Sequence, residues 1–135
     1  MSYRARFRGK QINEGNTFAL TPGIHHVAII VASEESVEFY KRLGFEEFYR
    51  INRAYDTIAL LSGCGIELEL FIDPRHSPRM VPEPLGLRHI AFQVDKIEKT
   101  MNDLEIDPSK LSFDWMGRRY CNITDPDGNA VELHE

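Results

Sequence analysis

Gly23-Ile24-His25-His26-Val27-Ala28 recurs 63 positions further along the chain as Gly86-Leu87-Arg88-His89-Ile90-Ala91. The glycine, the second histidine, the alanine and two apolar positions all match without a gap. A single offset that holds across a whole chain indicates an internal duplication, so we expect two similar modules. The same offset aligns further residues in each half: Val31 with Val94, Gly65 with Gly128, and Glu69-Leu70 with Glu132-Leu133.

The first half contains the signals for one helix and several strands. His26–Val31 is short and rich in β-branched residues, which predicts a strand. Ser33 is expected to cap a helix that ends at Gly44, because acidic residues follow the cap and basic residues precede the glycine. Three more strands are expected near Glu46–Ile51, Thr57–Leu61 and Ile66–Phe71.

The second half repeats this order. His89–Val94 predicts a strand, and Asp95 is expected to cap the next helix with Glu98 in the capping-box position. Asp125-Pro126-Asp127-Gly128 is typical of a tight turn between the last two strands. The remaining strands are expected near Ser112–Met116, Arg118–Ile123 and Ala130–His134.

The two halves are expected to form one domain, because a unit of about 50 residues buries too little surface to be stable alone. We predict an α+β fold in which two tandem β-α-β-β-β modules form a cupped, mostly antiparallel sheet around a metal site. The predicted boundaries are a basic N-terminal arm at 1–22 and a single domain at 23–135. Within the domain, module one covers 23–72, a linker covers 73–86 and module two covers 87–135.

Charge and hydropathy exclude several classes of function. The net charge is −5, although residues 1–22 carry four basic side chains against one acidic side chain. An acidic body argues against nucleic acid as a ligand. No apolar run approaches the roughly 18 residues needed to cross a bilayer, and the first residues do not resemble a secretory signal. We therefore expect a cytoplasmic protein with no nucleic-acid or membrane partner.

The repeat predicts a metal site formed by His26, Glu69, His89 and Glu132. Each histidine precedes its glutamate by 43 residues in both halves. If a pseudo-twofold axis relates the halves, the four side chains converge near that axis. Two neutral imidazoles and two carboxylates carry a charge of −2, which a divalent cation neutralises. Nitrogen and oxygen ligands suit nickel, cobalt, zinc, manganese or iron.

Two positions have competing candidates. His25 lies beside His26, and Glu67 lies on the same strand face as Glu69. Only His26 and Glu69 have a histidine or glutamate mate at the 63-residue offset, which favours them as ligands.

These motifs closely resemble the vicinal oxygen chelate superfamily, which includes glyoxalase I, bleomycin-resistance proteins and extradiol dioxygenases. The resemblance covers about residues 23–135 and is strongest to short bacterial glyoxalase I-like proteins. It depends on four segments: His25-His26-Val27-Ala28-Ile29, Glu38-Phe39-Tyr40 with Leu43-Gly44-Phe45, Leu87-Arg88-His89-Ile90-Ala91-Phe92, and Asp125-Pro126-Asp127-Gly128-Asn129-Ala130-Val131-Glu132-Leu133.

The resemblance implies an activity of the lactoylglutathione lyase type. Glyoxalase I enzymes use His, Glu, His and Glu in this order, whereas related epimerases generally carry glutamine at the position of Glu69. The expected reaction isomerises the hemithioacetal of an α-ketoaldehyde, such as methylglyoxal, and a thiol, such as glutathione, through a metal-bound enediolate. Glu132 is expected to act as the base, with Glu69 sharing its role. Nickel or cobalt is favoured as the metal, and a homodimer is expected.

Two alternatives remain open. The site can serve another metalloenzyme of the superfamily, such as an epimerase, a thiol transferase or a dioxygenase. Alternatively, the chain binds a small molecule without chemistry, and Trp115, Phe113 and Tyr120 are then candidates to line its pocket. Arg88 and Arg119 are candidates to bind a substrate carboxylate, because a guanidinium can pair with it through two hydrogen bonds.

Overall fold

The computed structural model describes residues 23–135, so the predicted basic arm at 1–22 lies outside the described residues. Module one consists of β1 (His26–Val31), α2 (Glu34–Arg42), β2 (Glu46–Asn52), β3 (Thr57–Gly63) and β4 (Ile66–Ile72). Module two consists of β5 (His89–Gln93), α3 (Ile97–Asp103), the short 3-10 helix η1 (Pro108–Lys110), β6 (Ser112–Phe113), β7 (Arg119–Thr124) and β8 (Ala130–His134).

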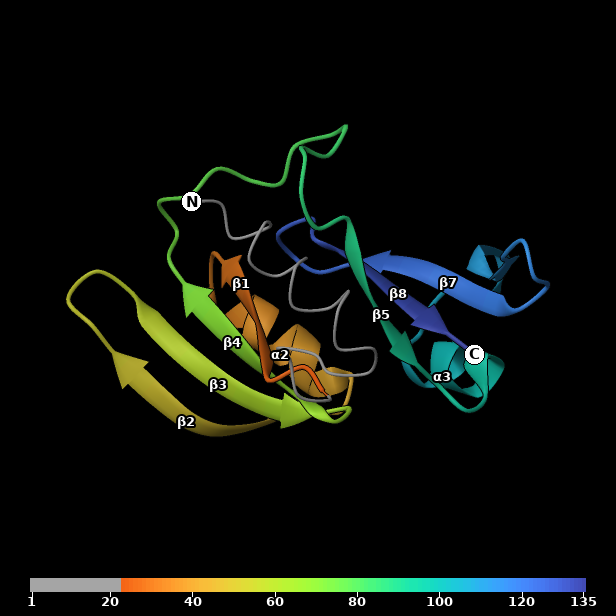
Figure 1. Cartoon of the computed structure of the whole chain (residues 1–135), viewed down its shortest axis with the longest axis horizontal. Coiled ribbons are helices and arrows are strands. Elements are labelled where there is room, and N and C mark those ends of the chain that lie inside the picture. The colour runs from red at the N-terminus through yellow and green to blue at the C-terminus, as the bar shows by residue number, and fades with distance from the viewer. Residues whose placement is uncertain (1–22) are drawn as a thin grey trace, which may run out of the picture.

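Each module folds into one four-stranded sheet, and the two sheets lie side by side (Figure 1). The strand orders are β1-β4-β3-β2 and β5-β8-β7-β6, which are equivalent under the repeat. The first and last strands of each module pair in parallel, and the other pairs are antiparallel. The predicted α+β fold, with two mixed and mostly antiparallel sheets, is therefore confirmed.

Helix α2 begins and ends where its sequence signals predict. The hydroxyl of Ser33 accepts a hydrogen bond from the backbone N–H of Glu35, so it caps the first turn. At the other end, Gly44 has a φ of 108°, a conformation that residues with a side chain rarely adopt. The buried face of the helix, which includes Val37 and Tyr40, packs against the sheet of module one.

Two details of module two differ from the prediction. Asp95 does not cap α3, which begins at Ile97 without a side-chain cap from its own N-terminal flank. The carboxylate of Glu135 accepts the N–H of Ile97 instead, at 3.1 Å. Strand β6 ends at Phe113, three residues earlier than predicted, because the Asp114 carboxylate accepts the N–H groups of the next turn.

The modules share one hydrophobic core. Buried residues of both modules form a single cluster, and the rings of Phe45 and Phe92 meet across the boundary with centroids 5.4 Å apart. Sharing a core supplies the burial that a module of this size lacks alone.

Polar contacts add to this boundary. The turn between β7 and β8 hydrogen-bonds to module one: the Tyr40 hydroxyl donates to Asp125 at 2.7 Å, and Asp127 accepts from the Ser36 hydroxyl and the Ala32 N–H. We call these contacts the inter-module latch.

Candidate metal centre

The first His–Glu pair lies on β1 and β4. The parallel register places Ala28 beside Glu69, so His26 lies two residues away along the neighbouring strand and on the same face. Nε2 of His26 lies 3.4 Å from Oε2 of Glu69, and the two side chains are 40% and 25% exposed. The sheet thus presents a nitrogen and an oxygen donor next to each other on partly exposed side chains.

The neighbouring His25 orients this histidine. The Nδ1 atoms of His25 and His26 lie 2.9 Å apart, and the rings meet edge to face. A hydrogen bond at Nδ1 leaves Nε2 of His26 as the nitrogen that faces Glu69. Metal-binding histidines are commonly held in this way through their second ring nitrogen. His25 thus contacts the His26 ring, and its place beside His26 was the only sequence signal for this contact.

The second pair repeats the first on β5 and β8. Ala91 lies beside Glu132 in the same parallel register, and Nε2 of His89 lies 3.3 Å from Oε2 of Glu132. The 43-residue spacing in each half thus produces the same strand register and the same side-chain contact. Glu132 is the less accessible glutamate, with its side chain 13% exposed.

The donor chemistry of both pairs fits a divalent metal ion. Metal–nitrogen and metal–oxygen bonds of about 2.0–2.2 Å place neighbouring donors about 3.0–3.5 Å apart around one ion. The observed separations of 3.4 and 3.3 Å lie in this range. Within residues 23–135, however, no three His, Cys, Asp or Glu side chains lie close enough together to bind one ion. One chain therefore presents the four predicted ligands as two separate pairs.

The surroundings of the two pairs differ. His134 stacks on Tyr120, and its Nε2 lies 3.1 Å from Asp114 and 3.8 Å from Glu132. Burial opposes ionisation of Asp114, but the N–H groups of Arg118 and Met116 lower the pKa of its carboxyl. This carboxylate thus holds His134 beside the second pair. At the position of His134, module one has Phe71, so its pair has an apolar neighbour there.

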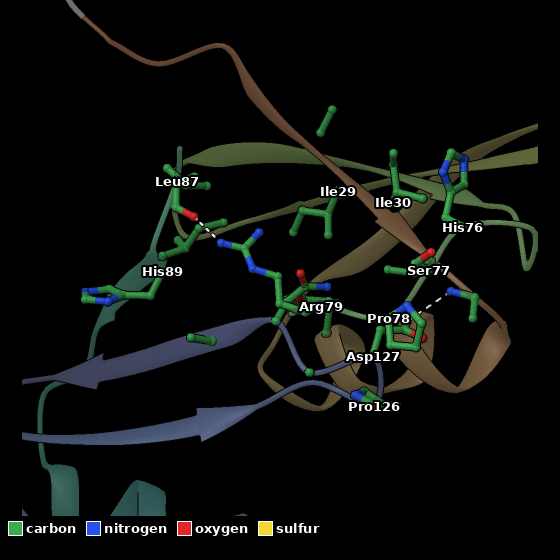
Figure 2. A pocket seen from close by; sticks show the side chains of 18 of the residues that line it. Ile29, Ile30, His76, Ser77, Pro78, Arg79, Leu87, His89, Pro126 and Asp127 are labelled. Carbon is green, nitrogen blue, oxygen red and sulfur yellow. Dashed lines mark hydrogen bonds between the residues drawn. The ribbon is translucent and has the colours of Figure 1, made fainter. Parts of the chain in front are cut away.

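Two cavities adjoin the second pair. The inter-module cavity has a volume of about 930 Å³ and lies between β1, the linker and the β7–β8 turn (Figure 2). The hairpin cavity has a volume of about 670 Å³. It is lined by the linker, the β6–β7 hairpin and one face of the second sheet. His89 lines both cavities, and Glu132 lines the hairpin cavity.

The arginine candidates have different positions. Arg88 lines both cavities, and its Nε lies 2.7 Å from Glu83. Arg119 lines neither cavity, because its guanidinium forms ion pairs with Glu98 and Glu135. Those carboxylates raise the pKa of Arg119. The structure therefore places Arg88 near the second pair. Arg119 instead forms ion pairs at the N-terminal end of α3.

Residues 23–133 match the family model for the glyoxalase/bleomycin resistance protein/dioxygenase superfamily. The match covers nearly all of both modules, and it confirms the resemblance that the motifs indicate. The chain belongs to this superfamily.

This chain matches several proteins over almost their whole length. It is 36% identical to uncharacterized protein YwkD of Bacillus subtilis (strain 168), over 86% of this chain and 98% of that protein. The crystal structure of a glyoxalase family protein from Enterococcus faecalis has a TM-score of 0.75 at 36% identity, over 84% and 98% of the two chains. A lactoylglutathione lyase from Agrobacterium tumefaciens shares the fold, with a TM-score of 0.61 at 23% identity over 85% and 94%.

No helix in residues 23–135 has both the length and the apolar character needed to cross a membrane.

Proposed function

We propose that this protein is a glyoxalase I-like, metal-dependent lyase that isomerises the hemithioacetal of an α-ketoaldehyde and a thiol. The observation that carries the proposal is the duplicated His–Glu pair. Both halves present a histidine nitrogen and a glutamate oxygen within 3.4 Å of each other on partly exposed side chains. Four such ligands neutralise a divalent ion, with nickel or cobalt favoured and zinc, manganese or iron as alternatives.

We further propose that a second copy of the chain completes the site. His26 and Glu69 lie on the first sheet, and His89 and Glu132 lie on the second. Both histidines are more than a third exposed, so each pair can contact another molecule. A twofold dimer would bring module one of each copy against module two of the other, because a twofold axis makes both contacts equivalent. A homodimer of this kind has two sites.

The proposed chemistry moves one proton between adjacent carbons. A divalent ion held by His26, Glu69, His89 and Glu132 would supply Lewis-acid chemistry for the substrate oxygens. Glu132 removes the proton from the carbon that carries the hydroxyl and the sulfur, and it returns the proton to the former carbonyl carbon. The product is a thioester of a 2-hydroxy acid. The hydroxyl proton moves from the first oxygen to the second in the same conversion, so atoms and electrons balance without an oxidant or a second reactant.

Glu132 is suited to this role by its position. Its side chain is mostly shielded from water, and it lines a cavity large enough for a small substrate. Glu69 is more exposed and holds the opposite side of the site, where it can share the proton transfer. These positions support the roles that the resemblance implies for the two glutamates.

The test restores one metal at a time to protein stripped with a chelator. Nickel or cobalt is expected to restore formation of the S-lactoyl thioester from methylglyoxal and glutathione, with two metal ions bound per dimer. If no metal supports turnover with glutathione or another common thiol, the proposed reaction is wrong. Oxygen uptake that requires iron would instead identify a dioxygenase.

A non-catalytic binding protein is the second candidate, because aromatic side chains line the hairpin cavity in exposed positions. Trp115 is 97% exposed and Phe113 is 65% exposed, so neither is a core residue. Such side chains are typical of a surface that receives an apolar ligand. Wild-type protein that binds none of these metal ions would support this candidate.

A further inference from the structure

The hairpin cavity gathers basic side chains next to the second His–Glu pair. Arg79, Arg88 and Arg118 line it together with His89 and Glu132. Three carboxylates, those of Glu83, Asp114 and Glu132, line the same cavity, so its charge depends on which arginines they neutralise. An arginine that these carboxylates leave without an ion pair would attract an anionic ligand.

The three arginines differ in what already neutralises them. Arg88 pairs with Glu83 at 2.7 Å, and Arg118 pairs with Asp114 at 3.0 Å. Arg79 donates instead to the backbone carbonyl of Leu87. In the part of the chain that the structure describes, no carboxylate oxygen lies within 4 Å of the Arg79 guanidinium. Of the three arginines, Arg79 is thus the one without a direct ion pair among these residues, although its charge helps to lower the pKa of Glu83.

Arg79 has a defined position between the two cavities. It lies on the linker and lines both the inter-module cavity and the hairpin cavity. Figure 2 shows its side chain extending into the cavity, with the guanidinium held next to Leu87 on the segment that leads to His89. Its Cβ packs over Gly128, where an added methyl group would approach it to 3.5 Å. These contacts orient the guanidinium before any ligand binds, which favours affinity.

We propose that Arg79 binds an oxyanion of the substrate, either a carboxylate or a phosphate, that is separate from the two oxygens of the reacting carbons. This inference rests on the proposed function, and it assigns the substrate class as an anionic adduct. The rest of the adduct is apolar where it meets Trp115, Phe113, Met80 and Val81, which line the same cavity and are exposed. A guanidinium binds either oxyanion through paired hydrogen bonds.

Trp115 provides a binding test that requires neither metal nor turnover. It is the only tryptophan of the chain and it lines the hairpin cavity, so its fluorescence reports on ligands there. The probes are S-methylglutathione, its dimethyl ester without carboxylates, and inorganic phosphate. S-methylglutathione is expected to bind about tenfold or more tightly than the ester, because a charge-assisted hydrogen bond is lost in the ester. Competition by phosphate at millimolar concentration would identify a phosphate-binding site, and its failure would identify a carboxylate-binding site.

Variants assign the effect to Arg79. In Arg79→Gln the preference for S-methylglutathione over its ester is expected to disappear, and Arg79→Lys is expected to keep part of it. Arg42→Gln is the matched control, because Arg42 also donates to a backbone carbonyl and lines neither cavity. It is expected to bind like the wild type. If Arg79→Gln does not fold, the wild-type preference decides: equal binding of acid and ester overturns the proposal.

Turnover separates this inference from the proposed function. The wild type is compared on methylglyoxal adducts of 3-mercaptopropionate, which is anionic, and of 2-mercaptoethanol, which is neutral. Preference for the anionic adduct that Arg79→Gln abolishes supports the inference. Equal turnover of both adducts by both proteins would overturn the role of Arg79 and leave the lyase activity in place. Tight binding of S-methylglutathione without any turnover would overturn the lyase and leave the anion site.

Discussion

His26 and His89 each approach a glutamate through Nε2. Because both side chains are exposed, a substitution at either position should change metal binding more than folding stability. Both side chains lie on sheet faces, 40% and 36% exposed, and not in the shared core. Substitution of either one removes a donor with little loss of packing. Function and stability can therefore be measured separately at these positions.

The first prediction concerns the metal. His26→Ala is expected to lose bound nickel or cobalt, measured by elemental analysis, because one of four ligands is removed. Its stability without metal should change by less than about 1 kcal/mol in urea unfolding, since the side chain is not part of the core. His76→Ala is the control, because His76 contacts Asp73 and neither pair. Wild-type metal content in His26→Ala would contradict the predicted site.

The second prediction concerns the base. Glu132→Gln is expected to lower kcat by about 10²-fold or more, because an amide cannot accept the substrate proton. Glu67→Gln should retain activity, since Glu67 lies on the same face as Glu69 but has no glutamate at its repeat position. Turnover of S-lactoyl thioester formation by the metal-loaded proteins is the measurement. If Glu132→Gln stays fully active, the proton transfer must be assigned to another group.

At the scale of elements, the inter-module latch joins α2 to the β7–β8 turn. Tyr40 is buried and donates to Asp125, which also accepts from Asn129 and Asp127. Burial, and then the charge of Asp125, raise the pKa of the Tyr40 phenol far above its usual value. The neutral phenol therefore contributes to the free energy of unfolding at neutral pH. This contribution of the inter-module latch decreases when high pH ionises the phenol.

The third prediction follows from this raised pKa. A raised pKa means that the contribution of Tyr40 is fully present below about pH 10 and is lost as the pH rises further. Tyr40→Phe is expected to destabilise the protein by about 1–3 kcal/mol at pH 7, through the lost hydrogen bond. The difference between wild type and variant should shrink above pH 10 in urea unfolding. Tyr55→Phe, at an exposed position, is expected to show neither effect.

Local signals predicted most elements, and long-range contacts explain the exceptions. The cap of α2 at Ser33 depends on residues within one turn, so the sequence was sufficient. The cap of α3 comes from Glu135, 38 residues further along the chain, and no local pattern indicates it. The 63-residue offset predicted that the two modules carry equivalent His and Glu positions, because it aligns one module with the other.

At the scale of the whole molecule, the relative position of the two modules decides which side chains meet. The repeat did not predict that one chain keeps its two pairs apart, because that depends on how the sheets pack through Phe45, Phe92 and the latch. The role inferred for Arg79 was also not predictable, since it depends on where the linker passes.

The fourth prediction tests the shared site by mixing two inactive variants. His26→Ala and His89→Ala are each expected to be inactive as homodimers. In a mixed dimer, one site combines both substitutions and the other combines two intact modules. After subunit exchange at equal concentration, activity and metal content should return to about a quarter of the wild-type values. A self-contained site would give no recovery, whereas mixing His26→Ala with Glu69→Ala should give none in either case.

The inter-module latch has a consequence for biosynthesis. Tyr40 and Asp125 lie 85 positions apart, and Ala32 and Asp127 lie 95 positions apart. A ribosome therefore translates all of module one, the linker and most of module two before the acceptors of these donors exist. Module one therefore leaves the exit tunnel before the Tyr40 hydroxyl can donate to Asp125. Native closure of α2 is thus a late event of translation, and a chain stopped before the β7–β8 turn would expose this surface to chaperones and proteases.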